Sequence, residues 1–522
     1  MTRRGVVALV FPITLLLFAT FFFFGDLGYW NDDYHFTNRD PVTGGFDSLI
    51  KTTRDPFLPS TGSLCAWRPL HNVLTPALLT IFWDHDWIVH LAGVLLHAAA
   101  AGLFYALLRA LGRSVHGSAA AVMLFIVWAA HYEVVLWPSA FATGLATSCY
   151  LAVALMYVRL AKAGCGGWWL LAPMTVLAAA VPCLNEQPAG MFAALPLAYM
   201  AVRPKGERLG QSLVRALVPT ACFGAVCIAY ILYVRANAQP GWGVSEEYYA
   251  PAAEWPRRLG QVARGMRSQF FMRYFATGAL EQGWVELRAW SVMALLWSGA
   301  LAGAAVVGLR LWVGTPTHGP GSPQHATARP WWVAAFGVAM FIGACLPLAV
   351  TQYYVANSRT CYPALLGVLL ALTVIGDSVG RLVHHRPRLS RPYLVTTGLG
   401  LLAIFALLSV IYIGAQGRAR RTNHRDVAIA ARLRELAPHP PAGTIFLPLH
   451  IAHEAVLTGY RPFDHQLVSA WDKSWAVPFL IKFAYGRSDV YAAYRIRGYE
   501  PIIEMHQDYI IFEWAFDTPY PN

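Results

Sequence analysis

Two adjacent carboxylates, Asp32 and Asp33, follow the first apolar segment of the chain, in the sequence WNDDYHF at positions 30–36. Aromatic residues gather at membrane–water interfaces, so these neighbours are expected to hold the two carboxylates at membrane level. A carboxylate there could act as general base toward an acceptor hydroxyl. The pair could instead hold a divalent metal ion near a phosphate, or it could be no more than a solvated helix end.

Two arginines occur where a phosphate could be bound. Arg68 lies in the sequence CAWRPL at 65–70, and Arg359 in YYVANSRTCYP at 353–363. A guanidinium group can bind a phosphate through two parallel hydrogen bonds. Arg359 is also predicted to lie next to a helix start, where an anion is favoured. The alternatives are that Arg68 reaches to lipid headgroups and that Arg359 is a membrane anchor.

Further ionisable residues stand at the ends of apolar segments. His131 and Glu133 end the third such segment, and Glu186, after Asn185, ends the fifth. An ionisable residue inside a membrane span is costly and is a functional candidate by default, although a buried structural hydrogen bond would also explain it. Carboxylates from three separate outer turns are thus predicted on one side of the membrane, which is stronger evidence than any one of them.

These residues must be positioned by membrane-spanning helices. Of the 522 residues, 57% are hydrophobic and 13% charged, whereas soluble domains carry about 25% charged residues. A helix of about 20 apolar residues crosses a bilayer, and about eleven segments fit. The clear ones are 6–24, 88–108, 119–137, 141–160, 168–184, 213–234, 290–312, 331–350 and 393–413, and the shorter ones are 189–202 and 362–375. The short apolar segment 70–83 is interpreted as a re-entrant or interfacial helix.

The net charge of +12 comes from basic clusters between apolar segments. With the N-terminus inside, every short cytoplasmic turn is basic, as the positive-inside rule requires. The clusters therefore indicate orientation, and no nucleic-acid partner is expected. This topology leaves loops 25–87 and 235–289 and the tail 416–522 outside the cytoplasm. The Ala- and Arg-rich composition favours a bacterial plasma (inner) membrane.

The predicted architecture is an all-α, multi-pass membrane domain over 1–415 with a small extracytoplasmic α/β domain over 416–522. The tail is more polar than the rest of the chain. It contains a helical stretch at 426–436 and two strand-like stretches at 444–447 and 509–513. The first apolar segment lacks a signal-peptide cleavage site, so it is expected to remain as a span.

The order of these motifs over roughly 1–376 resembles membrane glycosyltransferases of the GT-C fold. The sequence DDYHF at 32–36 is similar to the Asp-Glu-x-His-Phe motif of protein O-mannosyltransferases. The transmembrane-and-TPR O-mannosyltransferases have elements similar to 68–70, 95–98, 131–135, 185–186 and 358–363. The departures are Asp33 in place of Glu, Asn185 in place of Lys, and the lack of a TPR array in this sequence.

The resemblance implies an inverting transfer of sugar from a polyprenyl-phosphate donor to a hydroxyl of a glycan, lipid or protein acceptor. Asp32 would be the base, and Asp33 would orient it or hold the acceptor. Arg359 and Arg68 would neutralise the leaving phosphate. Lining the pocket would be His35, His131, Glu133 and Glu186. No cofactor is implied beyond the divalent cation already considered.

Two rival functions are a transporter or flippase of lipid-linked glycans and a non-catalytic membrane scaffold. A glycosyltransferase and a transporter would both show charges within the membrane. A transporter often shows two similar halves with interrupted helices in matching positions, and no such symmetry is seen in this sequence. The acidic outer loop and the polar outer tail favour an enzyme.

Overall fold

The computed structural model describes residues 68–82, 84–128, 132–163, 169–204, 206–237, 251–267, 270, 279–289, 329–350, 358–384, 387–448, 480–481, 484–485, 490–492 and 509–512. The predicted spans 6–24 and 290–312 lie outside these residues. The same is true of Asp32, Asp33, His35 and His131, so those predictions are not tested here.

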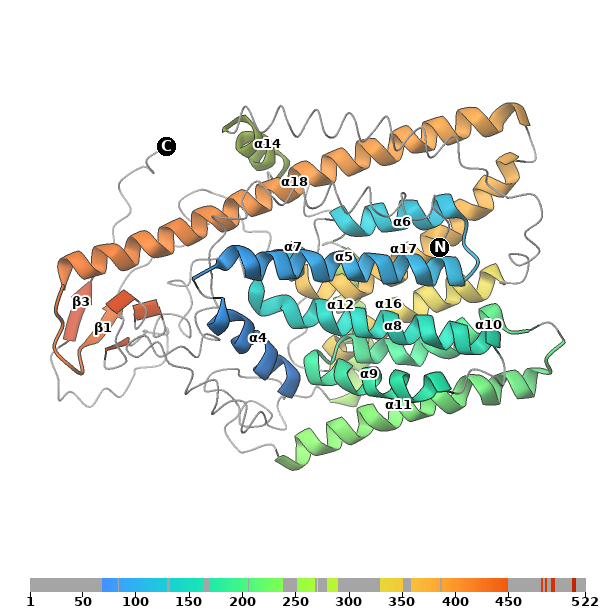
Figure 1. The fold of residues 1–522 in the computed structure, drawn as a ribbon, viewed down its shortest axis with the longest axis horizontal. Coiled ribbons are helices and arrows are strands. Elements are labelled where there is room, and N and C mark those ends of the chain that lie inside the picture. Colours follow the sequence, from blue (N-terminus) through green and yellow to red (C-terminus); the bar gives the residue numbers. More distant parts are fainter. Residues whose placement is uncertain are drawn as a thin grey trace.

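The described chain is built mainly from long helices lying side by side (Figure 1). They are α5 (Asp86–Ala110), α6 (Val115–Val127), α8 (Phe141–Ala163), α9 (Leu171–Leu184), α10 (Leu195–Val202), α11 (Leu209–Asn237), α16 (Pro330–Val350), α17 (Ser358–His384) and α18 (Pro387–Leu436). Within the described residues, six helical segments are long and apolar enough to cross a membrane. The protein is therefore a multi-pass membrane protein, whereas the predicted total of about eleven spans is not tested by this set.

Shorter helices pack around this bundle. They are α4 (Pro69–Ile81), α7 (Tyr132–Leu136), α12 (Trp255–Arg267) and α14 (Ala279–Ala289), with 3-10 turns η2 (Pro138–Ala140), η4 (Pro188–Ala194) and η6 (Ala252–Glu254). At about 1.5 Å per residue, the 13 residues of α4 extend about 20 Å, less than the roughly 30 Å hydrocarbon core. It packs against α8 and α9 at one end of the bundle.

Two predicted spans are interrupted in the structure. The predicted span 119–137 is not one helix, because α6 ends at Val127 with extended backbone at Trp128 and only the short α7 follows. The predicted span 189–202 begins as the 3-10 turn η4 before α10. A Cβ added to Gly190 in that turn would lie 2.2 Å from the carbonyl oxygen of Gly343 in α16. Only glycine permits this close approach.

The core joins helices that are distant in sequence. His97 of α5 lies with Nδ1 2.9 Å from the Tyr362 hydroxyl of α17 and with Nε2 3.2 Å from the Ile126 carbonyl of α6. Its ring also packs against Phe125, with 5.0 Å between centroids. All four residues are buried, so this polar contact is enclosed in an apolar core that fixes α17 against α5 and α6.

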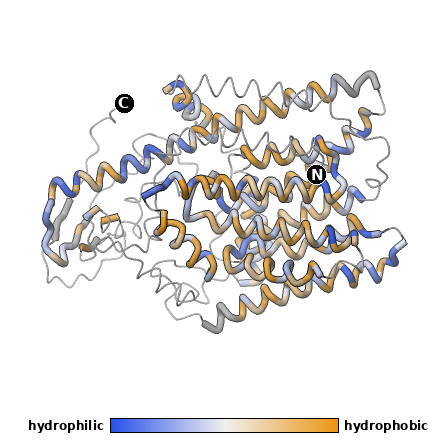
Figure 2. Tube along the Cα trace, in the orientation of Figure 1, coloured by the Kyte–Doolittle hydropathy of each residue, from blue (hydrophilic) through white to orange (hydrophobic). Residues whose placement is uncertain are grey.

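Helix α18 is 50 residues long, or about 75 Å. The sequence predicted a span at 393–413 and a separate helix at 426–436, but the structure has one continuous helix. The reason is that no proline occurs between Pro392 and Pro438, so nothing forces the backbone to break. Along α18 the residues change from hydrophobic to hydrophilic (Figure 2), as expected for a helix longer than the bilayer is thick.

Beyond α18 lies a three-stranded parallel sheet of order β2-β1-β3, formed by β1 (Ile445–Pro448), β2 (Tyr491–Ala492) and β3 (Tyr509–Phe512). β1 and β3 fall where the sequence predicted strands. The Tyr485 hydroxyl donates to the Leu433 carbonyl of α18 at 2.9 Å, and its ring stacks on Phe446 of β1. Most of the predicted 416–522 domain lies outside the described residues, so its extent remains a prediction.

Candidate active site

Four of the predicted site residues meet at the end of the bundle that the sequence places outside the cytoplasm. Arg68 precedes α4, Glu133 lies in α7, Glu186 in the turn between α9 and η4, and Arg359 in the first turn of α17. Two cations and two carboxylates therefore come together from elements separated by up to about 290 residues. The sequence predicted that they share a side of the membrane, and the structure adds their contacts.

Arg68 and Glu186 form a two-pronged ion pair. Nε of Arg68 donates to Oε2 of Glu186 at 2.7 Å, and Nη2 donates to Oε1 at 2.5 Å. The side chains keep 26% and 30% of their surface exposed. Arg68 is placed by the following Pro69, which starts α4 and disfavours a helical backbone at Arg68. The guanidinium of Arg68, which the sequence suggested for binding a phosphate, therefore binds the carboxylate of Glu186.

The turn that carries Glu186 is held on both flanks. Nδ2 of Asn185 donates to the Thr143 hydroxyl at 2.8 Å, and its Oδ1 accepts from the backbone N–H of Gln187 at 3.0 Å. Nε2 of Gln187 donates to the carbonyls of Thr360 at 2.6 Å and Ala344 at 3.1 Å. The buried amides therefore bind the turn to α8, α16 and α17, and only the acidic side chain between them is left to face Arg68.

Glu133 joins α7 to the start of α17. Its side chain is fully buried, and Oε2 accepts from the backbone N–H of Arg359 at 3.3 Å. A carboxylate at a helix N-terminus is stabilised by the helix dipole, so one donor of the predicted anion site already has a protein partner. The Arg359 guanidinium lies 5.3 Å from the ring centroid of Trp137, within cation–π range.

The two arginines act electrostatically on the same neighbours. His71 of α4 is buried and shares a 2.9 Å hydrogen bond with Thr75. Burial, followed by the charges of Arg68 and Arg359, lowers its pKa from 6.5 to about 3. Burial would raise the pKa of Glu186, but Arg68 and Arg359 outweigh it and the pKa is lowered from its ordinary value. At neutral pH the site thus holds a neutral histidine and an ionised glutamate.

Three buried polar groups near this end were not predicted from the sequence. The Trp137 indole N–H, the Tyr412 hydroxyl and the Gln416 amide have no hydrogen-bond partner among the described residues. An unsatisfied buried polar group costs about 1–3 kcal/mol, so each requires an explanation. Tyr412 and Gln416 lie on α18, which packs against α7. The one sequence feature that could have indicated these groups is the position of Gln416, directly after an apolar segment and at the predicted domain boundary.

The other predicted site residues cannot be located. Asp32, Asp33, His35 and His131 lie outside the described residues. Within the described part of the chain, no three His, Cys, Asp or Glu side chains are grouped as ligands for a metal ion. The carboxylates suggested for such an ion are Asp32 and Asp33, and a divalent cation there stays a prediction.

Comparison with known proteins gives only weak likenesses. No family model and no curated protein matches the chain. A crystal structure of ArnT from Cupriavidus metallidurans bound to undecaprenyl phosphate is similar with a TM-score of 0.39 and 14% identity, over 92% of this chain and 85% of that one. The Archaeoglobus fulgidus oligosaccharyltransferase, tethered with an acceptor peptide, is similar with a TM-score of 0.40 and 12% identity, over 92% of this chain and 63% of that one. Likenesses of this size establish no family.

Proposed function

We propose that this chain is an inverting glycosyltransferase of GT-C type, which moves a sugar from a polyprenyl-phosphate donor to an acceptor hydroxyl on the extracytoplasmic face of the membrane. The observation that carries the proposal is the meeting of Arg68, Glu186, Glu133 and Arg359 at one end of a membrane bundle. Charge gathered there suits a phosphate that arrives through the bilayer.

The two arginines would divide the work of binding the donor phosphate. Arg68 is held by Glu186, so it contributes mainly positive charge and position. Arg359 forms no ion pair within the described residues, and its guanidinium lies over Trp137. Its N–H donors are therefore the better candidates for the phosphate oxygens. Negative charge on this phosphate grows as the glycosidic bond breaks, and a preorganised cation stabilises that charge most in the transition state.

The reaction would proceed in one displacement. The acceptor hydroxyl oxygen attacks the anomeric carbon, and the bond from that carbon to the phosphate oxygen breaks. The bonding electron pair leaves with the polyprenyl phosphate, and the configuration inverts. Asp32 would take the hydroxyl proton, and Asp33 would orient it or hold the acceptor. These two roles rest on the motif resemblance.

The sugar itself would be held by three buried polar groups. The Trp137 indole, the Tyr412 hydroxyl and the Gln416 amide are buried without partners among the described residues. Sugar hydroxyls both donate and accept hydrogen bonds, so they could satisfy all three groups. Glu133, with His35 and His131 by resemblance, would line the rest of the pocket. A mannose-like donor follows from the resemblance alone.

The test is sugar transfer by purified protein in nanodiscs, supplied with polyprenyl-phosphate sugars and read out as released polyprenyl phosphate. Wild type should release it, and Asp32→Ala should lose at least about a hundredfold in rate, the usual contribution of a general base. Glu254→Ala is the matched control, because Glu254 belongs to an i,i+4 ion pair on a helix surface in the other outer loop. Equal rates in wild type and Asp32→Ala would reject Asp32 as the base.

The rival transport function predicts a different result from the same preparation. A flippase would move intact lipid-linked sugar between the leaflets of vesicles without releasing polyprenyl phosphate. A scaffold would show neither activity, and Asp32→Ala would change nothing.

A further inference from the structure

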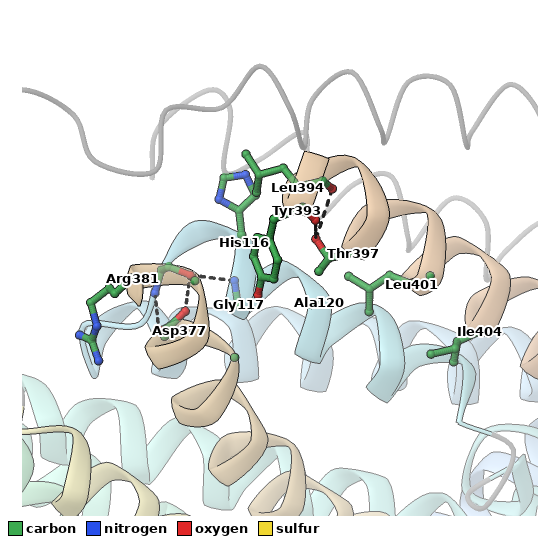
Figure 3. Close-up of a pocket in the computed structure, with 14 residues that line it drawn as sticks. His116, Gly117, Ala120, Asp377, Arg381, Tyr393, Leu394, Thr397, Leu401 and Ile404 are labelled. Atoms are coloured by element: carbon green, nitrogen blue, oxygen red, sulfur yellow. Dashed lines mark hydrogen bonds between the residues drawn. The ribbon is translucent and has the colours of Figure 1, made fainter. Parts of the chain in front are cut away.

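A second polar cluster lies at the end of the bundle opposite Arg359, beside a cavity of about 350 Å³ between α6, α17 and α18 (Figure 3). Its lining includes the polar residues Ser114, His116, Asp377 and Arg381 and the apolar residues Leu401 and Ile404. The positive-inside rule places this end in the cytoplasmic leaflet. The proposed sugar transfer uses none of these residues.

The rim of this cavity is polar, and its polar groups contact one another around Asp377. Both carboxylate oxygens of Asp377 accept from Ser114, one from its hydroxyl and the other from its backbone N–H at 3.0 Å. Nη1 of Arg113 lies 3.7 Å from the same carboxylate. A Cβ added to Gly117 would lie 2.5 Å from Asp377 Oδ1, so the glycine leaves room for this carboxylate beside α6. The negative charge of Asp377 is therefore already matched by protein groups.

The remaining charge at the rim is positive. Arg381 is exposed, and its Nη2 donates to Ser378 at 3.2 Å, which leaves the cation without a carboxylate among the described residues. His116 also lines the cavity (Figure 3). Basic side chains beside a membrane attract anionic lipid headgroups, so an anion is the favoured occupant of this rim.

The rest of the cavity is apolar and open. Added Cβ atoms at Gly376, Gly380 and Gly400 would meet no atom within 4 Å. The lining of α18 runs from Tyr393 to Ile404, about 16 Å at 1.5 Å per residue, which is close to the depth of one leaflet. Ile404 is 44% exposed, so the far end of the groove is open to the side. Its length and chemistry match one hydrocarbon chain.

We propose that this cavity binds one anionic glycerophospholipid of the leaflet at this end of the bundle. The phosphate would lie beside Arg381 and His116, and one acyl chain would follow α18 past Leu401 to Ile404. The occupant is amphiphilic because the rim is cationic and the groove apolar. The inference does not depend on the proposed transferase activity.

The experiment uses the full chain in nanodiscs with phosphatidylglycerol or phosphatidylcholine, both carrying the same diazirine-labelled acyl chain. After illumination, mass spectrometry measures the label on peptides that contain Leu401 and Ile404. Wild type should be labelled about fivefold more by phosphatidylglycerol, and Arg381→Glu should remove this preference. Equal labelling of wild type by both lipids would overturn the proposal.

Cavity-filling variants test the groove itself. Gly400→Leu should lower labelling by at least about fivefold, because its side chain would take the place of acyl carbons. Gly224→Leu is the matched control, since Gly224 of α11 also has open space around an added Cβ but lies outside the cavity. Gly376→Leu fills the groove from α17 and is the alternative variant if Gly400→Leu does not fold. Labelling of both fillers at the level of Gly224→Leu would reject the site.

Discussion

The two ends of the bundle each hold an arginine–carboxylate pair, with very different surroundings. Arg113 and Asp377 keep only 3% and 8% of their side-chain surface exposed, and Asp377 also accepts two hydrogen bonds from Ser114. Arg68 and Glu186 keep 26% and 30% exposed, with a second cation, Arg359, acting on the same glutamate. Buried polar groups without hydrogen-bond partners among the described residues occur at both ends, including Arg113 Nη1 at the inner one.

This difference separates two uses of the same residue pair. At the inner end the pair joins the turn between α5 and α6 to α17, and both oxygens of its carboxylate already accept hydrogen bonds from Ser114. At the outer end the pair stays partly exposed, and a second arginine, Arg359, acts on the same carboxylate. We interpret the Arg113–Asp377 pair as a structural contact and the Arg68–Glu186 pair as part of a binding surface. Stability and activity measurements at the two ends can test that distinction.

The largest expected effect is on stability at the inner end. Asp377→Ala should lower the free energy of unfolding by about 3–5 kcal/mol, because it leaves the buried Arg113 without a counter-charge. The activity per folded molecule should stay the same. Denaturant titration in mixed micelles measures the change. Glu435→Ala, which breaks the exposed Arg432–Glu435 pair, is the control, and equal losses in the two variants would break the comparison.

At the outer end the expected effect is on activity. Arg359→Ala should lower kcat/KM for the lipid donor by about 10²–10³-fold, the range seen when one transition-state hydrogen-bond donor is removed. Arg359→Lys should recover only part, because it keeps the charge and loses the planar fork. Arg267→Ala, at an exposed arginine of α12, should be near wild type. An active and stable Arg359→Ala would remove Arg359 from the site.

A smaller effect should appear in the dependence of stability on pH. The folded pKa of His71 is about 3 against 6.5 ordinarily, so between these values the unfolded chain binds one more proton. Stability therefore falls as the pH decreases from 6.5 toward 3, by at most about 1.4 kcal/mol per pH unit. Denaturant midpoints between pH 7.5 and 4.5 should show a shallower slope for His71→Gln. The exposed-histidine control His85→Gln should keep the wild-type slope, and an unchanged slope in both would contradict the assignment.

Sequence patterns predicted the individual helices well where hydrophobicity decides them. The predicted span 88–108 became α5 (Asp86–Ala110), and 141–160 became α8 (Phe141–Ala163). An apolar segment about 20 residues long has few alternatives to a helix in a membrane protein. Boundaries set by backbone contacts were missed, as at η4, where the approach of Gly190 to Gly343 is visible only once the helices are packed.

The sequence predicted that the candidate site residues share one side of the membrane, but it did not predict which of them contact each other. Arg68 and Glu186 are separated by 118 residues, and no local pattern indicates that one would take up the guanidinium fork of the other. Gln416 was missed for another reason. Hydropathy falls near this residue, which predicts the end of a span, but α14 packs along α18 there and Arg421 pairs with Glu286. Helical structure therefore continues past the apolar segment.

Because α18 is one uninterrupted helix, its number of residues fixes how far the sheet is rotated about the helix axis relative to the bundle. Each residue of a helix turns the chain by about 100° and advances it by about 1.5 Å. Inserting one residue between Arg421 and Leu433 would thus rotate β1 by about a quarter turn relative to the outer site, whereas seven residues would restore its azimuth to within about 20°. Sequence changes in this stretch are constrained by angle far more than by length.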